Sequence, residues 1–120
     1  MSVLTREEIL SFNDLSMEIV NVPEWGGDVK VRCLTGGERD ELESLVVREK
    51  GDGDKNIDLS NFRARLVALS AIDENGNRLF TLDDVKELAK KSAKALDRVF
   101  NVAERLSALR VKDEEKAIKN

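Results

Sequence analysis

Reactive chemistry has few side chains available in this sequence. The 120 residues include no histidine and no tyrosine, and they include one cysteine, Cys33. Without histidine, a Ser-His-Asp triad or a Cys-His pair cannot form, and the commonest metal ligand is missing. Cys33 continues the alternation of Val29 and Val31, which is typical of a small buried hydrophobe in a strand rather than of a nucleophile. We therefore expect a protein that is not an enzyme and needs no cofactor or metal.

Residues 73–84 contain oxygen ligands that match a calcium-binding loop only in part. Counted from Asp73, Asn75 and Asn77 take the third and fifth positions, as such a loop requires. Gly76, however, lies at the fourth position instead of the sixth, and the twelfth is Asp84 instead of glutamate. The sharp bend of a calcium loop needs its glycine at a fixed place. The pattern therefore predicts a turn rather than a metal site.

A row of basic side chains could contact phosphate groups. Its members recur every four residues, so they share one face if the segment is helical: Lys86, Lys90, Lys94 and Arg98. Against this stand the formal net charge of -4 and an aromatic content of 4%, which leaves no stacking platform for bases. A solvated or partner-facing row is the favoured interpretation. The alternative is a small adaptor or regulatory module that contacts nucleic acid through this face.

Protein binding is the chemistry that the remaining residues favour. Trp25 lies at an expected hairpin tip, where a large aromatic ring either folds back on the domain or anchors a partner. Residues 82–110 carry three adjacent heptad rows of mostly apolar residues, a stripe wider than a two-helix contact needs. We expect spare apolar surface there. The candidate protein-binding residues are Trp25, Val99, Val102, Leu106 and Leu109.

Charge is distributed unevenly along the chain. Residues 36–58 include eight acidic and four basic side chains, whereas residues 82–110 include seven basic and five acidic ones. If these surfaces lie on different sides of the domain, copies of the chain can associate head to tail into an open spiral or a ring. The residues assigned to this self-association are Glu38, Glu41, Lys86, Lys90 and Lys94.

Capping and alternation place the elements of the first half. Thr5 and Glu8 form a capping box that predicts a short helix over residues 6–12. Alternating β-branched residues over 17–22 and 29–34, separated by Pro-Glu-Trp-Gly-Gly, predict a β-hairpin.

A second capping box, Thr35 with Glu38, predicts a helix over residues 36–50 that is held by a narrow apolar stripe. The composition of residues 51–56 is that of a loop.

The second half is expected to be mainly helical. Leu59, Phe62, Leu66 and Leu69 recur at helical spacing after a capping candidate, Asp58, and predict a third, better buried helix. Residues 73–77 form a turn, and residues 79 and 80 are expected to form a short strand.

Residues 82–110 are expected to form the longest helical segment. It opens at a box of Thr81 with Asp84, and the polar residues 90–92 could divide it into two helices.

These elements predict an α+β fold that is mainly α-helical, with one amino-terminal β-hairpin, about four helices and a long carboxy-terminal helical segment. We expect a single domain over residues 1–110 and a charged tail over residues 111–120. The chain has no apolar stretch that resembles a signal peptide or a membrane span, and its lone cysteine fits a reducing compartment. A cytoplasmic location follows as an expectation.

Two stretches of the sequence are distinctive. The first is Val22-Pro-Glu-Trp-Gly-Gly-Asp-Val-Lys-Val-Arg, followed by Leu34-Thr-Gly-Gly-Glu-Arg-Asp, and the second is Asp73-Glu-Asn-Gly-Asn-Arg-Leu-Phe-Thr. Together with the helices around them, from about Val3 to Leu109, they resemble the small tail assembly chaperones of long-tailed, lambda-like bacteriophages.

That resemblance implies a non-enzymatic protein of the host cell cytoplasm that is absent from the mature virion. It also implies that the protein binds the tape measure protein, self-associates, and helps to recruit tail tube subunits through a longer form made by ribosomal frameshifting.

Overall fold

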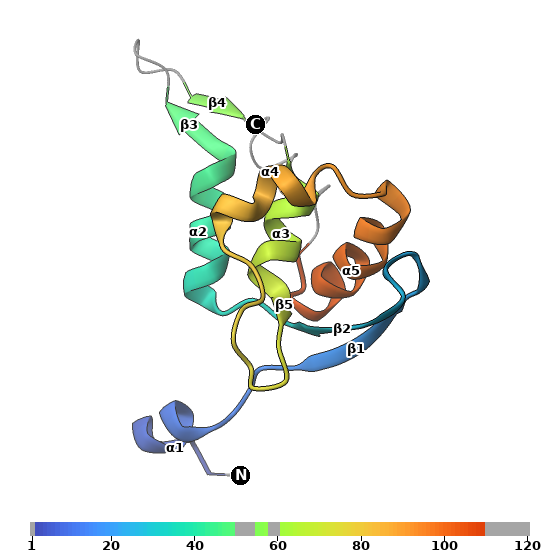
Figure 1. Ribbon diagram of the computed structural model, residues 1–120. Coiled ribbons are helices and arrows are strands. Elements are labelled where there is room, and N and C mark those ends of the chain that lie inside the picture. The colour runs from blue at the N-terminus through green and yellow to red at the C-terminus, as the bar shows by residue number, and fades with distance from the viewer. Residues whose placement is uncertain (1, 50–54, 58–60, 110–120) are drawn as a thin grey trace.

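The computed structural model describes residues 2–49, 55–57 and 61–109. Helix α5 packs on a three-stranded antiparallel sheet of order β1-β2-β5, α3 packs on α5, and α2 and α4 contact α3 (Figure 1). The helices are α1 (Arg6–Ser11), α2 (Gly36–Val46), α3 (Phe62–Ser70), α4 (Val85–Leu88) and α5 (Ala93–Leu106), with single 3-10 turns η1 (Pro23–Trp25) and η2 (Leu82–Asp84). The strands are β1 (Met17–Val22), β2 (Gly27–Arg32), β3 (Val47–Glu49), β4 (Lys55–Ile57) and β5 (Ala71–Ile72). The expected α+β, mainly helical fold is confirmed.

The predicted hairpin is confirmed as β1 and β2, which pair antiparallel from Met17 with Arg32 to Val22 with Gly27. Gly26 closes the turn at a φ of +74°, a conformation that favours glycine. The second strand begins and ends two residues earlier than expected. Cys33 follows the strand and is buried, as predicted.

The third strand of the sheet, β5, was not predicted from the sequence. Ala71 and Ile72 pair with Val31 and Lys30 of β2, directly after α3 ends. The strand expected at residues 79 and 80 is not formed. Instead, the chain returns beside β5 through a single bridge between Ile72 and Arg78. Two-residue pairing of this kind depends on a distant partner and leaves no periodic signal in the sequence.

Helix α2 ends at Val46, earlier than the predicted end at residue 50. Strand β3 follows it at once and pairs antiparallel with β4, so Lys55 and Asn56 are in a strand rather than in the predicted loop. Residues 51–54 of that loop lie outside the described residues. β-branched residues at 46 and 47 favour this change from helix to strand.

Helix α3 lies at the centre of the core, as its predicted burial requires. Leu66, Val67 and Leu69 are fully buried, and so are most of their neighbours in the helix. Phe62 contacts Phe100 of α5 edge to face, with ring centroids 6.1 Å apart. The predicted capping residue, Asp58, lies outside the described residues, and Asn61 is the residue that precedes the helix.

The long helical segment expected over residues 82–110 is two helices, α4 and α5. They are separated at residues 89–92, where the polar residues 90–92 had suggested a possible division. Thr81 and Asp84 form the predicted capping box, which opens η2 and α4. The backbone of Ser92 is not helical, and its side-chain oxygen accepts a hydrogen bond from the Ala95 N–H at 3.1 Å. Ser92 therefore caps a new helix, α5. Residues 111–120, the expected charged tail, lie outside the described part of the chain.

Candidate protein-interaction surfaces

The hairpin tip is tied to helix α5. The Glu24 carboxylate accepts hydrogen bonds from Arg98, from Nε at 2.8 Å and from Nη2 at 3.1 Å. The hydrogen bond from Arg98 lowers the pKa of Glu24, and the same contact raises the pKa of Arg98. This bidentate pair holds η1 over α5.

Trp25 is half-buried and packs against the hydrophobic core from its place in η1. It therefore covers the core and keeps part of its ring exposed. The two alternatives that the sequence left open, a lid on the core and an anchor for a partner, are compatible in this position.

The expected spare apolar surface of the carboxy-terminal segment is mostly absent. Val99 is 0% exposed and Leu109 is 2% exposed, so both belong to the chain's own core and offer no surface in this fold. Val102 and Leu106 are half-buried at the edge of that core. The reason is that α5 lies between the sheet and α3 and uses its apolar face on both. Partner contact through Trp25, Val102 and Leu106 stays a prediction.

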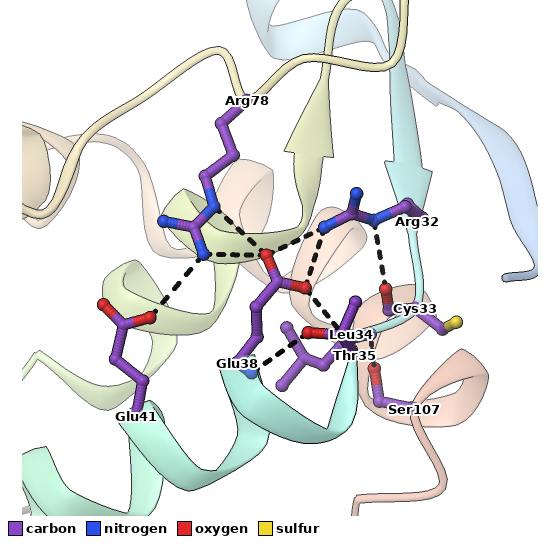
Figure 2. A network of polar contacts seen from close by, with 8 residues as sticks. All are labelled: Arg32, Cys33, Leu34, Thr35, Glu38, Glu41, Arg78 and Ser107. Carbon is purple, nitrogen blue, oxygen red and sulfur yellow. Dashed lines mark hydrogen bonds and ion pairs between the residues drawn. The ribbon is translucent and has the colours of Figure 1, made fainter. Parts of the chain in front are cut away.

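Glu38 is the centre of a buried ionic cluster, not a member of an exposed acidic face (Figure 2). Its side chain is 11% exposed and accepts hydrogen bonds from Arg32 Nη2 at 2.7 and 2.8 Å. Arg78 donates to the same carboxylate from Nη2 at 2.7 Å and from Nε at 3.1 Å. Both carboxylate oxygens are therefore already engaged within the chain, and a contact of Glu38 with another copy stays a prediction. Glu41 stays half-buried at the rim, 3.6 Å from Arg78.

The cluster also contains the predicted capping box. The Thr35 N–H donates to Glu38 Oε1 at 2.9 Å, and the Glu38 N–H donates to Thr35 Oγ1 at 3.1 Å. Burial raises the pKa of Glu38, but the Thr35 hydrogen bond and the two arginines outweigh it, so the pKa lies below its ordinary value. Glu38 thus joins the start of α2 to β2 and to the segment that carries Arg78. The sequence predicted the cap but neither arginine contact. Arg78 lies 40 residues further along the chain, and Arg32, six residues away, is in a different element, β2.

The basic row is not one helix face. Lys86 is in α4, Lys90 follows that helix, and Lys94 is in the first turn of α5; all three are exposed. Lys90 forms an ion pair with Glu87 at 3.3 Å, and Arg98 is engaged by Glu24. The division of the segment at residues 89–92 therefore removes the continuous phosphate-binding row on which the nucleic-acid alternative depended.

The segment from Asp73 to Asn77 is a turn, as predicted. Asp73 Oδ1 accepts hydrogen bonds from the N–H groups of Asn75 at 2.8 Å and Asn77 at 3.0 Å, so this oxygen holds the turn together. Within the described ranges, no cluster of three or more acidic or cysteine side chains is placed to hold a metal ion. None of the helices described is both long and apolar enough to cross a membrane.

Most of the exposed large apolar side chains lie near the amino terminus, where the sequence predicted no site. Among the residues that the structure describes, the large apolar side chains that are exposed are Val3, Leu4, Ile9, Leu10, Phe12, Met17, Ile19 and Leu79. All but Leu79 precede residue 20, and α1 buries none of its residues. The signal available in the sequence was Ile9, Leu10 and Phe12 in a helix of two turns with no apolar element expected to cover them.

Comparison with known proteins agrees with this fold. A family model described as phage tail assembly chaperone matches residues 9–119. The structure of the bacteriophage HK97 tail assembly chaperone is similar, with a TM-score of 0.59 and 17% sequence identity, over 83% of this chain and 90% of that chain. No curated protein matches the sequence. Because the family model matches nearly the whole chain, this protein belongs to the phage tail assembly chaperone family.

Proposed function

We propose that this protein binds the tape measure protein of a bacteriophage tail and helps to recruit tail tube subunits during tail assembly. The observation that carries the proposal is the family match over residues 9–119. The protein acts by binding and not by catalysis, in the cytoplasm of the infected host, and it is absent from the mature virion. A longer form made by ribosomal frameshifting provides the contact with tube subunits.

The exposed apolar surface supports a role in binding other proteins. Exposed apolar side chains that gather on one part of a protein often mark a contact with a partner, and seven large apolar side chains are exposed within residues 3–19. Trp25 adds a half-buried ring at the opposite end of β1. Such surfaces cover apolar segments of a client before it assembles.

The proposal includes self-association into a spiral or ring. Glu41 of α2 and the exposed Lys86, Lys90 and Lys94 remain the candidate contacts, while Glu38 is occupied within its own chain. Analytical ultracentrifugation at low and high salt tests this contact, because an ionic interface weakens as salt screens it. A protein that stays monomeric at millimolar concentration in low salt would contradict it.

Co-purification tests the central claim. The tagged chain is expressed with its cognate tape measure protein, and recovery is compared for wild type, Trp25→Ala and Leu106→Glu, with Lys91→Ala as an exposed control. We expect wild type and the control to retain the tape measure protein and the other two variants, once shown to be folded, to retain less. A folded wild-type protein that never recovers it would refute the proposed function.

A further inference from the structure

Strand β1 lies at the edge of the three-stranded sheet, and no described element pairs with its outer side. Figure 1 shows β1 along the lower rim of the domain, below β2. Its sequence, Met-Glu-Ile-Val-Asn-Val, contains neither the proline nor the lysine with which many proteins protect such an edge. An unprotected edge of six residues is able to pair with a strand of another chain.

The backbone groups on the free edge belong to alternate residues. The Cys33 N–H donates to the Ser16 carbonyl oxygen at 2.9 Å, directly before the register of β1 with β2 begins. Hydrogen-bonded pairs alternate along an antiparallel ladder, so the N–H and C=O groups of Met17, Ile19 and Asn21 point away from β2. These groups are available to a further strand.

The side chains of the same residues lie on the face of the sheet that α5 does not cover. Met17 is 50% exposed and Ile19 is 65% exposed, whereas Val22 on the opposite face is fully buried. Glu18 is the one charged residue of the strand, and it accepts a hydrogen bond from Arg105 of α5. A second strand at this edge therefore meets apolar side chains and a carboxylate that is already paired.

Self-complementarity selects a second copy of the chain as the occupant. When two β1 strands pair antiparallel about a two-fold axis at Ile19, this residue lies opposite Ile19 of the other copy, and Met17 lies opposite Asn21. These are the residues whose backbone groups point outward, so each of those groups finds a partner. Glu18 lies opposite Val20, so like charges do not face each other.

The same register gives the amino-terminal arm, residues 2–16, a neighbour. The start of one β1 lies next to the end of the other, so each arm leaves the strand pair beside η1 of the second copy. The arm exposes Leu10 and Phe12, and η1 carries the half-buried Trp25. The pairing thus brings together apolar groups that a single copy leaves in water. A second copy always brings this arm with it, which a strand of another protein need not do.

We propose that two copies of this protein pair through the free edges of β1, so that their three-stranded sheets join into one continuous antiparallel sheet centred on Ile19. The inference deepens the proposed function and rests on it for the expectation that copies associate. It adds a symmetric contact of backbone and apolar groups to the ionic contact described above. The two contacts differ in salt dependence, because salt screens charges but not strand pairing.

Sedimentation equilibrium measures this contact. We expect wild type to form a dimer that persists in high salt. Ile19→Lys and Ile19→Glu each place two like charges opposite each other across the two-fold axis, and each should raise the dimer dissociation constant at least about tenfold. Leu79→Lys is the matched control, because it introduces the same charge at another exposed apolar residue, and it should dimerise like wild type. Circular dichroism checks that every variant is folded.

A mixture of the two Ile19 variants gives a result that a merely structural role of Ile19 does not produce. In a mixed dimer the introduced lysine and the introduced glutamate lie opposite each other, with Cβ atoms about 5 Å apart. At moderate salt, the equimolar mixture should therefore recover the dimer that neither variant forms alone. A mixture that stays monomeric would overturn the pairing centred on Ile19.

Other results would also overturn the proposal. They are a wild-type protein that stays monomeric at millimolar concentration, and Ile19 variants that dimerise like wild type. If wild type is monomeric and Ile19→Lys loses the tape measure protein, the edge of β1 binds a strand of another protein instead.

The test separates this inference from the proposed function. A wild-type dimer that responds to the Ile19 variants as expected but never recovers the tape measure protein would support the strand pairing and refute the proposed function. A monomer that recovers the tape measure protein would do the reverse.

Discussion

Glu38→Gln tests the buried ionic cluster that joins α2, β2 and Arg78. The substitution keeps the shape of the side chain and one acceptor oxygen, but it removes the negative charge and replaces the second oxygen by a donor. In wild type both oxygens accept hydrogen bonds from Arg32 or Arg78, and Oε1 also accepts from the Thr35 N–H. The variant leaves two guanidinium groups facing a neutral amide.

The expected loss follows from the burial of the partners. Removal of one partner from a fully buried ion pair costs about 3–5 kcal/mol, because an uncompensated charge remains. Here the side chain of Arg32 is 17% exposed and that of Arg78 is 36% exposed, so water reaches part of each guanidinium group. We therefore expect Glu38→Gln to lower the free energy of unfolding by about 2 kcal/mol, which is a fall of roughly 8 °C in Tm for a chain of this size.

The lowered pKa of Glu38 determines how its contribution to stability changes with pH. The pKa of Glu38 in the folded protein lies below its ordinary value of 4.5, so the unfolded carboxyl takes up its proton first as the pH falls. The stabilisation is fully present above about pH 4.5 and is lost as the pH falls through the folded pKa. Wild type and Glu38→Gln should therefore differ at neutral pH and converge on acidification.

Urea denaturation between neutral pH and about pH 3 measures both effects. Glu41→Gln is the control, because Glu41 lies on the same helix but is 3.6 Å from Arg78 at a 40% exposed position. Its effect should stay within about 0.5 kcal/mol. If Glu38→Gln matches wild type at neutral pH, or if the difference does not narrow in acid, the assignment of a stabilising role to this carboxylate is wrong.

Four further substitutions test the core that the site residues share. Trp25→Ala should lower the free energy of unfolding by about 2 kcal/mol in urea titration, because the half-buried ring covers the core. Val99→Ala should lower the free energy of unfolding by about 2 kcal/mol, and a variant as stable as wild type would place Val99 outside the core. Leu106→Ala should lower it by less than the truncation of a fully buried leucine would, because Leu106 is half-buried. Ser107→Ala removes the acceptor of the Leu34 N–H at 2.9 Å, so that amide should exchange its hydrogen faster, at a cost of about 1 kcal/mol; unchanged exchange would contradict the bond.

The sequence by itself determined the elements whose signals are local. Capping boxes at Thr5, Thr35 and Thr81 join residues three positions apart, and each of them starts a helical element in the structure. The hairpin followed from period-two alternation around a turn that contains Gly26. These features need only short-range hydrogen bonds and backbone preferences, so the residues involved are neighbours in the chain. The resemblance to tail assembly chaperones also came from such local stretches.

Only the tertiary structure decided which side chains stay exposed and available to a partner. The sequence pattern predicted that Val99 and Leu109 are exposed apolar residues, but both are buried, because α5 packs between the sheet and α3. The sequence pattern predicted that Glu38 is an exposed acidic residue, but its carboxylate accepts hydrogen bonds from Arg78, which lies 40 residues away. In contrast, the apolar side of α1 stayed uncovered because no other element of the described chain packs on it. Burial and ion pairing depend on which segments, far apart in the chain, come into contact, and the local pattern of residue types does not determine those contacts.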